Sequence, residues 1–130
     1  MERQVTSVDQ EWTAFVASLK DEQCGAGLSP ARLAEALDLP LDRLAAVVRV
    51  HRATITHAPD TPRVQEAMGD ILRVLGAAHS LSGSLDATLF WFRNQPIAGL
   101  RHLTPMRLLE QGKTEGLVSY VASIRGGAAG

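Results

Sequence analysis

Four histidines and one cysteine are the side chains of this sequence that most often perform chemistry: His51, His57, His79, His102 and Cys24. No two of them have the spacing of paired zinc ligands, and Cys24 has no second cysteine to pair with. For His79, near the end of an expected helix, contact with the last carbonyl groups is favoured over metal binding. We therefore expect no metal site and no internal disulfide.

The sequence motifs of common enzyme sites are absent as well. There is no nucleophile elbow, no P-loop and no glycine-rich dinucleotide loop. The glycines of Gly25-Ala26-Gly27 follow no strand pattern, so we interpret them as a helix breaker. Glu110 and Glu115 fall in different expected helices and are interpreted as a solvated pair. The sequence predicts a protein that is not an enzyme and carries no cofactor.

Charge is unevenly distributed along the 130 residues, whose net charge is −1. Residues 1–61 carry six basic and nine acidic residues, a net −3, and residues 62–130 carry seven basic and five acidic residues, a net +2. The chain therefore has no strong overall attraction to nucleic acid, and any DNA contact must come from a local patch.

A candidate patch for DNA surrounds a pattern that is typical of a helix-turn-helix. Residues 33–37 and Leu44 have the required spacing, and Asp38 takes the turn position usually held by glycine. Asp42, early in the second helix, would repel phosphates. The alternative is a two-helix corner that only packs. The candidate DNA-binding residues are Arg43, Arg49, His51 and Arg52, with His57 and Arg63 nearby, and they are expected to contact the DNA backbone rather than the bases.

The elements that position these residues are predicted to be helices throughout. Aromatic residues make up only 5% of the chain, so the core must consist mainly of aliphatic side chains, which favours helices over a β sandwich. Apolar residues recur at helical spacing from Trp12 to Leu19, and the most regular amphipathic helix begins near Val64. We expect an all-α fold of six to eight helices.

Capping residues and prolines mark the expected boundaries. Ser29-Pro30 and Thr104-Pro105 are typical of helix starts, and Gly112 of a helix end. Residues 54–62 contain two prolines and are expected to connect an N-terminal region, 1–61, to a C-terminal region, 62–130. The last helix is expected to bury Leu117, Val121 and Ile124 and to end at Arg125-Gly126-Gly127.

The C-terminal region resembles the toxin-binding domain of Xre/MbcA/ParS-type antitoxins. The resemblance rests on the residues Trp91-Phe92-Arg93-Asn94, Pro96-Ile97, Leu103-Thr104-Pro105, Leu108-Leu109, Gly112, Val118, Tyr120-Val121, Ile124 and Gly126. It covers roughly residues 62–130, and residues 1–61 are more loosely similar to the helix-turn-helix (Xre-like) region of the family. Before Thr104, where the family usually has a glycine-rich loop, this chain reads Gly99-Leu100-Arg101-His102-Leu103.

The resemblance implies an antitoxin of a type II toxin-antitoxin system. Its partner would be a toxin of the RES-domain class, which resembles ADP-ribosyltransferases and acts on NAD, and the C-terminal part would cover the entrance of the toxin's active site. Repression of its own operon by the N-terminal helices is a further implication. Basic side chains near the C-terminus suit an acidic cleft, and a Gly-Gly tail could thread a narrow one. The candidate toxin-binding residues are Arg101, Arg107, Lys113, Tyr120, Ser123, Arg125, Gly126 and Gly127.

Two other functions remain open at this stage: a DNA-binding regulator without a toxin, and a helical module for dimerisation or other protein contacts. Asp42 separates the antitoxin from the DNA-binding regulator, because a dedicated repressor should present basic or polar side chains there. We also expect a homodimer or a toxin-antitoxin hetero-oligomer, a cytoplasmic location and no membrane segment, since no apolar run approaches the roughly 20 residues that a span needs.

Overall fold

The computed structural model describes residues 7–22 and 27–129, and for 125–129 it describes the backbone alone. This part of the chain is all-α, as predicted, with eight α-helices and no strand. The helices are α1 (Ser7–Ser18), α2 (Pro30–Ala36), α3 (Leu41–Val48), α4 (Arg52–His57), α5 (Pro62–Ser82), α6 (Leu85–Asn94), α7 (Pro105–Glu110) and α8 (Thr114–Ala129). The 3₁₀ turn η2 (Ala98–Leu100) lies between α6 and α7.

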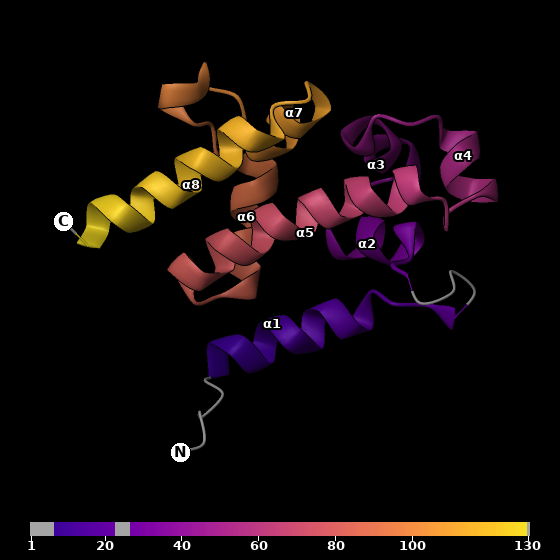
Figure 1. The fold of residues 1–130 in the computed structure, drawn as a ribbon, viewed down its shortest axis with the longest axis horizontal. Helices are drawn as coiled ribbons and strands as arrows, with labels where there is room; N and C mark the ends of the chain where they lie inside the picture. Colours follow the sequence, from indigo (N-terminus) through magenta and orange to yellow (C-terminus); the bar gives the residue numbers. More distant parts are fainter. Residues whose placement is uncertain (1–6, 23–26, 130) are drawn as a thin grey trace.

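The long helix α5 lies in the middle of the fold, between α1 and α8 in the view of Figure 1. Its 21 residues make it about 32 Å long at 1.5 Å per residue. Helices α1, α3, α6 and α8 all pack against it. Pro62 occupies its first turn, and Gly83, with a φ of 72°, ends it in the left-handed conformation that glycine adopts without strain.

Several predicted helix boundaries are confirmed by capping geometry. The Ser29 side chain accepts a hydrogen bond from the backbone N–H of Arg32 at 3.2 Å, and Thr104 does the same for Arg107 at 3.2 Å. Each is followed by the expected first-turn proline. Gly112 has a φ of 75° just beyond α7, as its interpretation as a helix end requires.

Helices α2 and α3 form the two-helix corner that the sequence predicts. Asp38 adopts the left-handed conformation, with a φ of 56°, at the position where glycine is usual. The N–H of Leu39 closes the turn by donating to the carbonyl of Ala34 at 2.8 Å. Leu33 and Leu44 are fully buried on the inner sides of the two helices. A corner of this shape is common to helix-turn-helix proteins and to helices that only pack.

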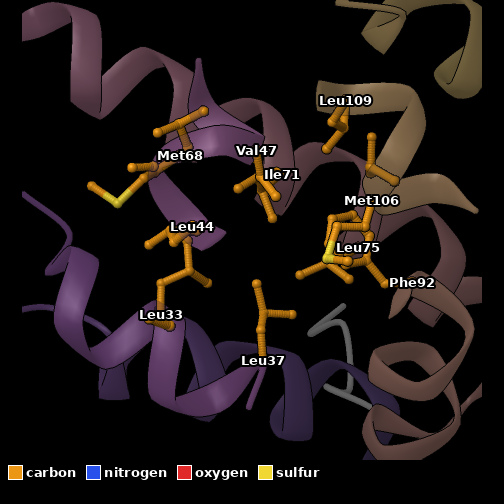
Figure 2. Packing of buried hydrophobic residues seen from close by; sticks show 14 of the residues in the cluster. Leu33, Leu37, Leu44, Val47, Met68, Ile71, Leu75, Phe92, Met106 and Leu109 are labelled. Carbon is orange, nitrogen blue, oxygen red and sulfur yellow. The ribbon is translucent and has the colours of Figure 1, made fainter. Parts of the chain in front are cut away.

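Side chains from both regions of the chain contribute to one hydrophobic core. Figure 2 shows residues of α2 and α3 close to residues of α5, α6 and α7. All of these residues belong to a single cluster of buried side chains. The labelled members are Leu33, Leu37, Leu44, Val47, Met68, Ile71, Leu75, Phe92, Met106 and Leu109.

The structure differs from two expectations about helix boundaries and from one about burial. Residues 54–57, predicted to be part of a connection, belong to α4, because Ile55 is buried and anchors that short helix. The last helix does not end at Gly126-Gly127 but continues to Ala129, since a helical glycine costs only about 1 kcal/mol and alanines follow. Ile124, predicted to be buried, is 41% exposed. Of the predicted helix breaker at residues 25–27, only Gly27 lies within the described residues, and Cys24 lies outside them.

Candidate protein-binding surface

The candidate DNA-binding residues divide into one that is engaged within the protein and three that are exposed. Arg43 Nη1 lies 3.0 Å from Glu110 Oε1 of α7, so this arginine joins the two regions of the chain. Arg49, His51 and Arg52 are exposed. On α3, four residues are buried, and the exposed side chains in its first two turns are Asp42 and Ala46. The N-terminal end of this helix, where a recognition helix contacts bases, therefore presents an acid.

Glu110 corrects another interpretation from the sequence. Its side chain is only 11% exposed and binds two cations, Arg43 and, at 3.0 Å, Arg107. Glu115 is well exposed and pairs with Arg73. The two glutamates are therefore not a solvated pair. One carboxylate instead holds a candidate DNA-binding residue, Arg43, and a candidate toxin-binding residue, Arg107, on either side of it.

Candidate DNA-binding and candidate toxin-binding residues also lie close together at the turn between α7 and α8. The guanidinium of Arg49 lies against Gly112, in the space that a Cβ atom there would fill. Arg63 donates to the backbone carbonyl of Arg49 at 3.2 Å, and Lys113 follows Gly112 in the chain. Among the described residues, Arg49, Arg52, Arg63 and Lys113 form no ion pair with a carboxylate, unlike Arg32, Arg43, Arg73, Arg93 and Arg107.

This arrangement predicts that Gly112→Ala destabilises the protein. Alanine at a φ of 75° costs about 1 kcal/mol or more, and its Cβ would also displace Arg49. We expect the melting temperature to fall by at least about 4 °C. The matched control is Gly116→Ala, because Gly116 is helical and has nothing within 4 Å of an added Cβ. That change should leave the melting temperature unaltered or raise it slightly. Equal losses in the two variants would contradict the assignment.

The loop that contains Arg101 is a closed turn with two left-handed residues in succession. Arg101 and His102 have φ values of 63° and 58°, and both side chains are exposed. The carbonyl of Ile97 accepts hydrogen bonds from the N–H groups of Leu100 and His102, each at 2.9 Å. A non-glycine residue in this conformation costs on the order of 1 kcal/mol. The backbone at these two positions is thus one that glycine adopts easily, although the residues are arginine and histidine.

The remaining candidate toxin-binding residues lie at or on α8. Lys113, just before the helix, and Ser123 are exposed, whereas Tyr120 is half-buried. The hydroxyl of Ser123 donates to the carbonyl of Tyr120 at 2.6 Å, which is a local bond within the helix. Arg125, Gly126 and Gly127 belong to the helical backbone of the last turns. The Gly-Gly tail that the sequence predicts beyond the helix is therefore part of the helical end of α8.

An apolar groove, which sequence reasoning missed, opens between the end of α5, α6 and α8. Its volume is about 220 Å³, and none of the side chains that line it is charged. Trp91 forms part of its wall and is half-buried. Ile124 of α8 lines it too and is 41% exposed. The lining residues are Ala78, Leu81, Ser82, Ala87, Thr88, Trp91, Val121 and Ile124.

The large hydrophobic side chains that the described residues expose are Leu81, Phe90 and Ile124, at 41%, 60% and 41%. Leu81 and Ile124 line the groove, and Phe90 lies on the outer side of α6. The helical periodicity of the sequence indicates that Phe90 is exposed. The predicted inner face of that helix, Leu85, Leu89 and Phe92, leaves this aromatic residue without a place in the core.

His79 is held in a different way from the one predicted. It is buried, and its Nε2 lies 2.7 Å from Glu11 Oε1 of α1 rather than at helix carbonyl groups. The same oxygen accepts from the N–H of Leu85 at 2.8 Å. These contacts, led by the bond to His79, lower the pKa of Glu11 from its ordinary value of 4.5. One carboxylate thus joins α1 to the end of α5 and the start of α6.

A pH dependence follows from the lowered pKa of Glu11. A group whose pKa is lower in the folded than in the unfolded state stabilises the protein when the pH lies above its pKa in the unfolded state. This contribution is lost as the pH falls through the pKa of the folded state. Glu11→Gln should therefore lower the melting temperature at pH 7, and the difference from the parent should shrink below pH 4.5. Thermal unfolding of parent and variant, followed by circular dichroism at pH 7 and again below pH 4.5, tests this. A difference that does not change with pH would contradict it.

The described residues contain no group of three or more histidine, cysteine, aspartate or glutamate side chains that could hold a metal ion. No helix among them is both long enough and apolar enough to cross a membrane. Comparisons of the chain with protein-family models, curated proteins and solved structures find no significant match.

Proposed function

We propose that this protein is a cytoplasmic, non-enzymatic antitoxin of a type II toxin-antitoxin system. Its C-terminal region binds a RES-domain toxin that consumes NAD or transfers ADP-ribose from it, and covers the entrance of the toxin's active site. The proposal rests on the resemblance of residues 62–130 to the toxin-binding domain of Xre/MbcA/ParS-type antitoxins. The all-α fold, with its short capped helix α7 before α8, agrees with it.

One structural observation carries the proposal: α8 projects beyond the body of the protein (Figure 1). Leu117, Val121 and Ile124 share one side of the helix at helical spacing, yet the first two are buried and Ile124 is exposed. Ile124 lies at the open groove beside the end of α5, and the helix continues past it to Ala129. A projecting helical end is a suitable shape for entering a cleft of another protein.

The outer side of α8 is suited to a close approach. Between residues 116 and 123 its exposed positions are Gly116, Ser119, Ala122 and Ser123, which are all small. Small side chains let a facing surface come near the helix backbone, so the helix occupies little space in a cleft. Arg101 and Lys113 are exposed, and no carboxylate pairs with them among the described residues. They would supply positive charge to an acidic cleft.

DNA binding is the second candidate function, either as autorepression by the antitoxin or as the activity of a regulator without a toxin. The observation that favours it is the exposed group of Arg49, Arg52, Arg63 and Lys113, which has no carboxylate partner among the described residues. Asp42 at the start of α3 and the engagement of Arg43 by Glu110 favour contacts to phosphates over reading of bases. Binding of this kind should be weak and sensitive to salt.

Co-expression in cells tests the proposed function. We expect the neighbouring reading frame to encode a RES-domain protein whose expression alone stops growth, and this chain to restore growth. A DNA-binding regulator without a toxin would leave growth arrest unchanged, although it would still retard a promoter fragment at low salt. Arrest that persists with the chain present at equal or higher levels would contradict the antitoxin function.

A further inference from the structure

The loop formed by residues 97–103 has a tip with two strained and exposed residues. Arg101 and His102 follow each other in the left-handed conformation, with φ values of 63° and 58°. Residues that have a Cβ atom visit this conformation singly, so two in succession are unusual. Both side chains are exposed, so packing of these side chains does not offset the strain. Strained positions of this kind occur mainly at sites of function.

The rest of the loop holds this tip in place between α6 and α7, at the edge of the fold (Figure 1). Ile97 is buried, and its N–H donates to the carbonyl of Leu103 at 3.0 Å. Leu103 in turn donates to the carbonyl of Leu100 at 3.2 Å. Leu100 and Leu103 are half-buried against the hydrophobic core. The loop is therefore closed and anchored, and the backbone of its tip is held in one conformation before a partner arrives.

The stretch of chain around this tip is basic. Residues 87–109 include three arginines and one histidine and no acidic residue. Two of the arginines, Arg93 and Arg107, pair with carboxylates outside this stretch, at 3.6 Å and 3.0 Å. Arg101 and His102 form no ion pair with a carboxylate anywhere in the described part of the chain. These two side chains are therefore the basic groups of the stretch that are left to bind a partner.

An acidic protein surface fits the two side chains better than nucleic acid does. The guanidinium of Arg101 can bind a carboxylate through two parallel N–H···O bonds, and the ring of His102 can donate one more. Binding to nucleic acid depends on many phosphate contacts made at the same time. The tip offers only two adjacent basic side chains, so its chemistry matches one or two carboxylates of a protein.

We propose that Arg101 and His102 together determine which toxin this chain recognises, by binding carboxylates on the surface of that toxin. The inference rests on the proposed antitoxin function, and it adds His102 to the residues that contact the toxin. It also accounts for the strain, because glycine at either position would relax the loop but would remove a side chain that contacts the partner. Since the tip is already ordered, little conformational entropy of its backbone is lost on association.

Opposite effects of the same variants on stability and on binding test this inference. Arg101→Gly and His102→Gly should each raise the melting temperature by about 2 °C or more, because glycine adopts the left-handed conformation without strain. Each should also raise the dissociation constant for the RES-domain protein, measured by titration calorimetry, at least about fivefold. A residue with a merely structural role would not give this combination.

Two further variants separate charge from loop conformation. Arg101→Lys keeps both the charge and the strain, so it should bind the toxin more tightly than Arg101→Gly and should melt like the parent. Gly99→Ala is the matched control in the same loop, because an added Cβ atom there meets nothing within 4 Å. This change should leave the dissociation constant as it is in the parent.

Glycine variants that bind the toxin as tightly as the parent would overturn the proposed contact, and glycine variants that melt below the parent would overturn the assignment of strain on which it depends. Unchanged toxin binding together with weaker retardation of a DNA fragment would assign the tip to nucleic acid and would likewise overturn the proposal. In each of these cases the parent still binds the toxin, so the antitoxin function stands. A parent chain that does not bind the toxin would overturn that function and this inference with it.

Discussion

Deletion of residues 125–130 is expected to abolish protection against the toxin while the protein stays folded. The deleted part follows Val121, the last buried residue among those of α8 whose side chains the structure describes, so the hydrophobic core keeps its described members. The melting temperature should stay within a few degrees of the parent value. If the projecting end of α8 enters the toxin's cleft, cells that produce the toxin should no longer grow when the truncated chain is co-expressed.

A single charge reversal provides a finer version of this experiment. Arg125→Glu should weaken protection, because a like charge facing an acidic cleft costs up to several kcal/mol at an interface. Lys20→Glu is the matched control, since Lys20 is exposed and follows α1 in the N-terminal region. If the truncated chain protects as well as the full chain, the end of α8 is not needed. Blocking would then have to be assigned to the surface between Trp91 and Lys113.

Leu44→Ala is expected to destabilise the whole protein and not only its N-terminal region. Leu44 is fully buried on α3 and belongs to the same cluster as Leu75 and Phe92 of the C-terminal region. Removal of a buried leucine side chain typically costs 2–5 kcal/mol, so we expect the melting temperature to fall by about 10 °C or more.

The same variant shows whether the two regions unfold together. Circular dichroism reports all helices, and fluorescence reports Trp12 and Trp91, one in each region. We expect both signals to change in a single transition with the same midpoint, in the parent and in the variant. Two separate transitions, of which Leu44→Ala moves only one, would contradict a shared core. Asp42→Ala on the same helix is the control, because Asp42 is exposed and should leave the midpoint nearly unchanged.

Local chemistry made much of the fold predictable from the sequence. Ser29 and Thr104 each precede a first-turn proline, and a hydroxyl oxygen at that position can accept a hydrogen bond from a free backbone N–H of the first turn. The structure shows both bonds. The left-handed turn at Asp38 was predictable because aspartate tolerates that conformation better than most residues. In these cases the interacting atoms lie within a few residues of each other, so the sequence pattern contains the whole interaction.

Contacts between distant residues were not predictable in this way. Glu11 and His79 are 68 positions apart, and nothing in either neighbourhood indicates that α1 crosses the end of α5. The engagement of Arg43 by Glu110 likewise depends on the packing of α3 against α7. Ile124 follows the buried periodicity of α8, but its burial depends on where the facing helices end. The groove could therefore not be predicted from the sequence. The exposure of Phe90 could have been predicted, because this residue falls outside the predicted inner face of α6.

Inhibition of the toxin in a purified system tests the central proposal most directly. The measurement is NAD consumption by the RES-domain protein expected from the neighbouring reading frame, titrated with increasing amounts of this chain. We predict that NAD consumption falls in proportion to the added chain and stops near one chain per toxin active site. The chain that lacks residues 125–130 should not reduce NAD consumption. Consumption that continues unchanged in the presence of a large excess of the full chain would contradict the proposal.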